Sequence, residues 1–359
     1  MAERKAVKKK ILKITAVVIV AVLLLSLGML ALTKIIYGAI FPRFDRTRIE
    51  TALNISYAEI MDTYPRQRVT FMSEENRLTG YIYGEKNTKG LVLIAPGLSD
   101  GAEDYTSLAM GFVDLGYRVF TFDTTGSFES EGESSVGFSQ EVIDLDNALH
   151  FIEKDPELKK LPLFLFGHSR GGYSSAMMCT TNHDIKAIAT AGAVNSPMEI
   201  TMEWSTNYVG PVAFTGYPAL YAYQAMIFGT DIMNTSAAEA LSESDIPSLV
   251  IHCENDVTVS VDGSSLYAHK DEVENPNAEF MLYENEENMG HTQLLFTKEA
   301  NLYREDILSE YENLLLKYGS EIPEDIENSF LDSIDSQKAQ EANLNLIELI
   351  SDFYLKNLS

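Results

Sequence analysis

The chain has 359 residues, of which 45% are apolar and 22% charged, a composition typical of a folded globular protein rather than a disordered one. Its formal net charge of −26 is unevenly distributed: residues 1–50 hold ten Lys or Arg and three Asp or Glu, whereas the rest of the chain holds 17 and 50. A body this acidic repels phosphate groups, so nucleic-acid binding is not expected.

The N-terminal segment predicts a single transmembrane helix. Six basic residues lie within residues 4–13, and the 20 residues at 14–33 that follow carry no charge. A helix of that length spans about 30 Å, the thickness of the hydrocarbon core of a bilayer. A cleaved signal peptide is the alternative, although its apolar region is usually shorter and ends at a small-residue cleavage site.

The charges that flank this segment predict its orientation. Six basic residues precede it and four follow it within residues 34–48, which favours a cytoplasmic N-terminus and an extracytoplasmic body in a single-pass cell-membrane protein. We expect residues 1–37 to form a basic tail and the membrane helix, residues 38–68 to form a connector, and residues 69–359 to form one globular domain.

Within this domain, short strand-like runs alternate with helical stretches, which predicts an α/β fold with a mainly parallel sheet covered by helices on both faces. The predicted strands are 69–71, 78–83, 90–95, 118–122, 163–166, 185–191, 248–252 and 279–283. The predicted helices are 103–115, 139–154, 171–181, 299–318 and 343–356.

One long insertion interrupts this alternation between the strands predicted at 185–191 and 248–252. It is dense in aromatic residues, among them Trp204, Tyr208 and Phe214. We expect a lid at about 197–246, with these three aromatic side chains lining an apolar pocket and binding substrate. The alternative is that they only pack the insertion onto the domain.

The segment Gly167-His168-Ser169-Arg170-Gly171 has the pattern G-x-S-x-G between a predicted apolar strand and a predicted helix. A sharp strand-to-helix turn needs small residues on both sides of the Ser, and it exposes the Ser hydroxyl above the sheet. Because a Ser hydroxyl is a weak nucleophile unless a base takes its proton, the motif predicts a partner histidine elsewhere in the chain.

His291 is the predicted base, since it lies in a loop after the last predicted strand. Asp256, which follows the strand predicted at 248–252, is the predicted acid that orients the imidazole, with Glu254 and Asp262 as alternatives. Backbone N–H groups of Leu98 and Arg170 are expected to form the oxyanion hole.

Cys179 and Cys253 are interpreted as buried thiols, although a single disulfide between them is an alternative. We find no Cys or His cluster with the sequence spacing of a zinc site. The sequence therefore predicts no metal and no cofactor.

Taken together, the Ser elbow, the chain order Ser169, Asp256, His291 and the Pro96-Gly97 loop resemble the α/β-hydrolase superfamily from about residue 69 onward. The run 123–132 resembles the D-x-x-G-x-G-x-S-x-G segment of lipase- and esterase-like members, with Phe128 where a Gly is usual. The resemblance implies an eight-stranded, mostly parallel sheet with a lid inserted before the acid strand.

Three functions remain open from the sequence. The leading one is a membrane-anchored serine hydrolase that cleaves carboxylic esters of a fairly apolar, lipid-like acyl substrate. The second is a peptidase or amidase with the same triad. The third is a non-catalytic binding module on a hydrolase fold.

Overall fold

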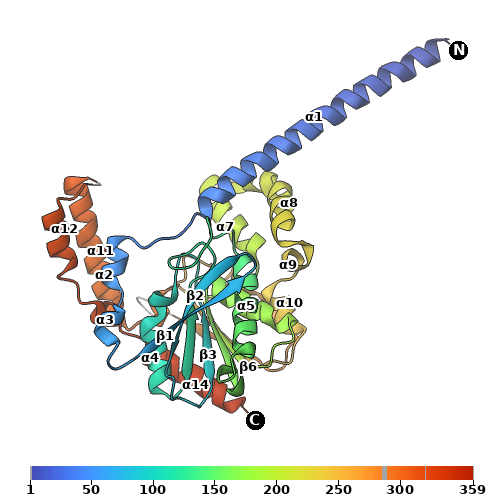
Figure 1. Ribbon diagram of the computed structural model, residues 1–359. Helices are drawn as coiled ribbons and strands as arrows, with labels where there is room; N and C mark the ends of the chain where they lie inside the picture. The colour runs from blue at the N-terminus through green and yellow to red at the C-terminus, as the bar shows by residue number, and fades with distance from the viewer. Residues whose placement is uncertain (1, 285–288, 320, 359) are drawn as a thin grey trace.

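An eight-stranded sheet forms the centre of the computed structural model, which describes residues 2–284, 289–319 and 321–358 (Figure 1). The strands lie in the order β1-β2-β4-β3-β5-β6-β7-β8; β2 pairs antiparallel with β1 and β4, and all later pairs are parallel. All eight predicted strands are confirmed. Their bounds are β1 Arg66–Ser73, β2 Asn76–Tyr83, β3 Leu91–Ala95, β4 Arg118–Phe122, β5 Leu163–His168, β6 Ile185–Ala191, β7 Ser248–Cys253 and β8 Ala278–Tyr283.

Side chains on successive positions of a strand point to opposite faces, and β3 shows how this builds two cores. Leu91 and Leu93 belong to one buried apolar cluster, whereas Val92 and Ile94 belong to another. Helices α5 and α6 cover the first face together with α10, and α4 and α14 cover the second. Their bounds are α4 Thr106–Asp114, α5 Gln140–Lys154, α6 Arg170–Met177, α10 Ala237–Ser242 and α14 Leu344–Lys356.

One helix in the described part of the chain, α1 Ala2–Ile40, is long and apolar enough to cross a membrane, a property that an N-terminal signal sequence shares. It projects away from the domain, but its last turns contact α8 Tyr217–Phe228 (Figure 1). There the buried ring of Tyr37 packs edge-on against Tyr223, with the centroids 5.3 Å apart. The helix therefore continues past the predicted boundary at residue 37 and joins the domain.

The connector is fixed at both of its ends. Arg43 donates hydrogen bonds to the carbonyl oxygens of Ser130 and Gly132, each at 3.0 Å. Two short helices, α2 Arg48–Leu53 and α3 Tyr57–Ile60, follow and lie beside the C-terminal helices (Figure 1). The side chains of Ile49 and Leu53 share an apolar cluster with residues of those helices.

These C-terminal helices are α11 Lys298–Tyr318, α12 Glu324–Leu331 and α13 Ser336–Ala339. The acidic stretch 319–342, whose residue 320 lies outside the described residues, thus supplies α12 and α13. The sequence did not predict either helix, because both are short and rich in polar residues.

The insertion before β7 is helical and covers the sheet edge. It contains α7 Pro197–Val209, a 3₁₀ segment Gly210–Gly216, α8, α9 Thr230–Asn234 and α10. Further 3₁₀ turns are Ala102–Tyr105, Leu158–Lys160, Met178–Thr180, Leu266–Glu272 and Gln293–Leu295. Cys179 and Cys253 are both buried and free, so the prediction of buried thiols is confirmed and the disulfide alternative is wrong.

Candidate active site

Ser169 occupies a strained turn between β5 and α6. Its φ of 55° and ψ of −117° are rare for a residue with a side chain, and such strain is concentrated at functional sites. A Cβ atom on Gly167 would lie 2.1 Å from the carbonyl oxygen of Gly171, and one on Gly171 would lie 2.1 Å from that of Ala95. Both positions therefore require glycine, as the tight turn predicted from the sequence demands.

Asp256 and His291 are joined at the carboxyl edge of the sheet. Asp256 follows β7, His291 follows β8, and Nδ1 of His291 lies 2.7 Å from Oδ2 of Asp256. The other carboxylate oxygen of Asp256 accepts the N–H groups of Thr258 and Val259, both at 2.9 Å. Burial would raise the pKa of Asp256, but the hydrogen bond and charge of His291 outweigh burial and lower the pKa below its usual range. Asp256 is thus held as a carboxylate against the imidazole.

His291 also contacts the elbow through His168, the neighbour of Ser169. Nε2 of His168 lies 3.1 Å from the carbonyl oxygen of His291, and the two rings are 4.9 Å apart. Within the described residues no hydrogen bond joins the Ser169 hydroxyl to the His291 imidazole. Catalytic hydrogen bonds of this type are often long without substrate and tighten in the complex, so this geometry is compatible with a triad.

The two predicted oxyanion donors come from the start of α6 and from the loop after β3. Arg170 is the first residue of α6, where the backbone N–H has no partner within the helix. Leu98 follows the loop after β3, in which the N–H of Gly97 is already taken by the hydroxyl of Tyr105 at 2.8 Å. Leu98 thus remains the residue of this loop that we expect to supply the second donor.

Behind the elbow, the side chain of Arg170 is fully buried and holds α6 against α5. Its Nε atom lies 2.6 Å from Oε2 of Glu141, and its Nη2 donates to the hydroxyl of Thr124 at 2.9 Å. Burial raises the pKa of Glu141, and the positive charge of Arg170 opposes that rise. This pair has a structural role, since both partners lie beneath the turn rather than at its surface.

The three predicted substrate-binding residues have different surroundings. Trp204 packs on Phe138 and donates its indole N–H to the carbonyl oxygen of Thr258 at 2.9 Å, so it lies against the loop of the acid. Phe214 is 61% exposed and lines an open cavity of about 550 Å³ between α7 and residues 263–269. Tyr208 is 89% exposed, because the last turn of α7 extends beyond the domain. The expectation that Tyr208 lines an apolar pocket and binds substrate stays a prediction.

Two contacts that support the predicted triad were missed in the sequence. The hydroxyl of Tyr105 contacts Nδ1 of His168 and Oδ2 of Asp100, both at 2.8 Å, which fixes the ring that touches His291. His252 lies on the other side, where its Nε2 is 3.0 Å from the carbonyl oxygen of Val259 in the acid loop. No sequence pattern predicts either contact, because each joins residues that are far apart in the chain or lie in an irregular loop.

Phe128 stands where a Gly is usual in the D-x-x-G-x-G-x-S-x-G segment. Its φ of 45° is the left-handed conformation that a Gly would adopt freely. The guanidinium of Arg46 lies 4.5 Å from the centre of its ring. A cation–π contact of this kind offsets part of the backbone strain. The connector thus supports the loop where the sequence departs from the superfamily pattern.

Part of the chain is similar to known proteins. Residues 86–226 match the family described as "Serine aminopeptidase, S33". A monoglyceride lipase of Saccharomyces cerevisiae is 31% identical over 105 residues, which are 26% of this chain and 32% of the lipase. The human monoglyceride lipase is 33% identical over 84 residues, which are 23% of this chain and 28% of the lipase. The chain thus spans about a third of the length of these curated relatives.

Among solved structures, an esterase from Pyrococcus furiosus has a TM-score of 0.54 at 15% sequence identity. The superposition covers 78% of this chain and 98% of the esterase. At 15% identity this similarity shows a shared fold alone. The shared fold, the strand order, the Ser elbow and the family match together identify the chain as a member of the α/β-hydrolase superfamily.

Proposed function

We propose that this protein is a membrane-anchored serine hydrolase that cleaves carboxylic esters of an apolar acyl substrate. The observation that carries the proposal is the 2.7 Å contact between His291 and Asp256 next to the strained elbow of Ser169. Ser169 attacks the ester carbonyl while His291 takes its proton and passes it to the leaving alcohol. Water, activated by the same imidazole, then releases the acyl group from Ser169.

The oxyanion of each tetrahedral intermediate is stabilised in this proposal by the N–H groups of Leu98 and Arg170. Backbone donors are suited to this task, because they are fixed before the negative charge develops. Asp256 stays ionised throughout and stabilises the imidazolium form of His291. No metal or other cofactor takes part in these steps.

Ester rather than amide cleavage is favoured by the relatives, since those of yeast and human are monoglyceride lipases. A peptidase with the same triad is the second candidate, and the family description "Serine aminopeptidase, S33" supports it. The non-catalytic alternative is disfavoured, because the strained Ser169 backbone and the paired Asp256 would have no use in it.

The lid supports action at a membrane surface. Residues 204–230 contain no Asp, Glu, Lys or Arg in a chain that is 22% charged. Exposed apolar patches of this kind mark binding surfaces. The large exposed apolar side chains of this segment are Tyr208, Val209, Val212, Phe214, Tyr217, Met226 and Ile227.

The anchor lies next to this lid. If residues 14–33 cross the bilayer, Tyr37 follows the span by about 6 Å of helix. Because Tyr37 packs on Tyr223 of α8, the uncharged lid then lies at the headgroup region on the side of the bilayer that holds the domain. Apolar side chains without nearby charges bind the interface of a membrane favourably.

The proposal is tested with the full chain in nanodiscs and p-nitrophenyl esters of short and long acyl groups. We expect turnover that increases with acyl length and is absent from Ser169→Ala. Turnover of aminoacyl p-nitroanilides, which contain an amide bond, would instead support the peptidase alternative. Lack of turnover of any ester by a correctly folded protein would rule out the esterase proposal.

The orientation of the anchor remains a proposal from flanking charge, with the N-terminus in the cytoplasm and the domain outside. Protease added to intact cells should then degrade the domain without lysis. Protection of the domain until the cells are permeabilised would show the opposite topology.

A further inference from the structure

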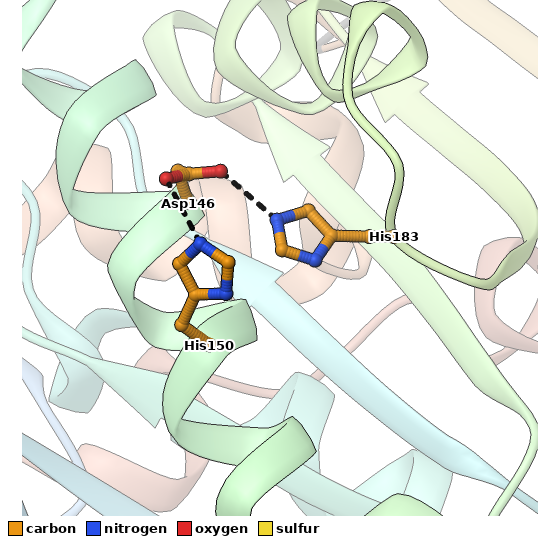
Figure 2. A group of neighbouring side chains, drawn as sticks. All are labelled: Asp146, His150 and His183. Carbon is orange, nitrogen blue, oxygen red and sulfur yellow. Dashed lines mark hydrogen bonds and ion pairs between the residues drawn. The ribbon is translucent and has the colours of Figure 1, made fainter.

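Two histidines and two carboxylates form a cluster that the proposed reaction does not use. Asp146 and His150 lie four residues apart on one face of α5, and His183 lies in the loop just before β6 (Figure 2). Nε2 of His183 is 2.9 Å from one carboxylate oxygen of Asp146, and Nε2 of His150 is 3.7 Å from the other. The three side chains converge, with their ligand atoms within 4.8 Å of one another.

Glu153, one turn further along α5, contacts the opposite nitrogen of each ring. Its carboxylate oxygens lie 2.6 Å from Nδ1 of His183 and 3.1 Å from Nδ1 of His150. A carboxylate that contacts Nδ1 orients a metal-binding imidazole so that Nε2 points toward the ion. Nε2 of both imidazoles faces the space that Asp146 also faces.

We propose that Asp146, His150 and His183 bind one divalent transition-metal ion of the Zn²⁺ class, with Glu153 as the carboxylate that orients both histidines. Two imidazole nitrogens and a carboxylate oxygen are a common three-residue set for Zn²⁺, which then takes water as its fourth ligand. Mg²⁺ and Ca²⁺ prefer oxygen ligands and are not expected to bind here.

Formation of the site needs only small movements. Zinc ligands about 2.0–2.2 Å from the ion lie about 3.4 Å from one another in a tetrahedron. His183 and Asp146 are already closer than that, and His150 has a side chain that is 50% exposed and free to adjust. The side chain of His183 is buried, so it supplies the fixed side of the site.

Charge also favours a cation at this place. Two carboxylates face the two imidazoles, and the domain outside residues 1–50 carries 50 acidic and 17 basic residues. A divalent ion would offset the local negative charge that the carboxylates place between α5 and the loop. The acidic surface would also raise the local concentration of cations.

The position of the cluster assigns it a structural rather than a catalytic role. His183 precedes β6 at the amino edge of the sheet, whereas Ser169 follows the parallel strand β5 at the carboxyl edge, so that the length of a strand, about 20 Å, separates them. A bound ion would join α5 to the start of β6. Because α5 also carries Glu141, the ion would hold in place the helix whose Glu141 pairs with Arg170 behind the elbow.

The sequence did not predict this site because its ligands have no metal-binding spacing. Asp146 and His150 are one helical turn apart, but His183 comes from another segment 33 residues later. Only the packing of α5 beside the loop before β6 brings them together.

The test is zinc binding by the full chain, free of affinity tags, in detergent micelles after treatment with a chelator. Calorimetric titration with ZnCl₂ should give one ion per chain, and saturation should raise Tm by about 5 °C. CoCl₂ should give visible absorption typical of a low-coordinate site, and MgCl₂ should have no effect on Tm.

The decisive variant is His150→Ala, because it removes a half-exposed ligand without opening the core. We expect its affinity for Zn²⁺ to fall at least tenfold, and that of Glu153→Gln to fall about 10–100-fold. His269→Ala is the matched control: His269 also lies between two carboxylates, Glu199 and Glu272 at 3.1 Å each, but none of the described histidines joins it in a group of potential metal ligands. It should bind Zn²⁺ like the wild type.

Absence of stoichiometric Zn²⁺ binding by the wild type would overturn the proposal. So would equal affinities of the wild type and His150→Ala, or a loss in His269→Ala as large as that in His150→Ala. In each of these cases the cluster would be a set of ion pairs that holds α5 to the loop without a metal.

Discussion

The indole N–H of Trp204 donates to the carbonyl oxygen of Thr258 at 2.9 Å, and this bond joins the first lid helix to the loop of the proposed catalytic acid, Asp256. The N–H of Thr258 in turn binds Oδ1 of Asp256, at 2.9 Å. A lid movement that displaces Trp204 would therefore change the position of the acid. Two hydrogen bonds thus connect Trp204 of the lid to Asp256, the residue proposed to orient the base.

The first prediction concerns this coupling. Trp204→Phe keeps an aromatic ring against Phe138 but removes the donor, so the free energy of unfolding should fall by about 1 kcal/mol. Because the loop of Asp256 is less constrained, kcat for a p-nitrophenyl ester should fall several-fold. Urea denaturation and steady-state kinetics measure the two effects. An unchanged kcat would show that the lid does not position the acid.

Asp256→Asn should lower kcat roughly 10³–10⁴-fold while the fold is retained, because a neutral amide no longer stabilises the imidazolium of His291. The amide oxygen can still accept the N–H groups of Thr258 and Val259, which preserves the loop. Kinetics and circular dichroism of the same preparation check both points. A loss of less than tenfold would mean that another carboxylate serves as the acid.

The residues of this site that the sequence predicts are those whose position is determined by neighbouring residues in the chain. Ser169 could be predicted, because the two glycines and the apolar strand lie within a few residues of it. Asp256 and His291 could be predicted from their positions after strands, since parallel strands place their carboxyl ends at one edge. The exposure of Tyr208 could not be predicted, because no residue near it in the sequence indicates that the last turn of α7 extends into solvent.

The same reasoning applies to the fold. Each of the eight strands has a continuous apolar run or a period of two, so its existence follows from the local pattern. Helices α12 and α13 are short and pack against the connector. Its Ile49 and Leu53 share one cluster with Phe330 and Leu331 of α12 and Ala339 of α13. Sequence periodicity does not report contacts between segments about 280 residues apart.

The elbow glycines give a third prediction. A Cβ at position 171 would lie 2.1 Å from the carbonyl oxygen of Ala95, a backbone atom that has no room to retreat. We expect Gly171→Ala to lose at least about 3 kcal/mol of unfolding free energy. Gly216→Ala is the control, since nothing lies within 4 Å of its Cβ and its stability should be unchanged. Equal stabilities of the two variants would contradict the close approach seen at the elbow.

The loop after β4 gives a prediction on pH. Asp123 is buried and accepts the N–H groups of Ala102 at 2.8 Å and Glu129 at 3.2 Å. Burial outweighs these bonds and raises its pKa to about 6. A raised pKa in the folded state means that the protonated acid is favoured there, so its contribution to stability is complete below about pH 4 and is lost as the pH rises through 6.

The measurement compares the wild type with Asp123→Asn, which cannot titrate at this position. From pH 4 to pH 7, the free energy of unfolding of the wild type should fall by about 2 kcal/mol relative to the variant. Parallel pH dependences of the two proteins would mean that Asp123 has an ordinary pKa in the fold.

The central claim is that Ser169 is a nucleophile activated by His291 and Asp256, and labelling by a fluorophosphonate probe tests it most directly. The account predicts covalent labelling of the wild-type protein at Ser169, slow labelling of His291→Ala, and none of Ser169→Ala. A folded wild-type protein that reacts no faster than Ser169→Ala would contradict it.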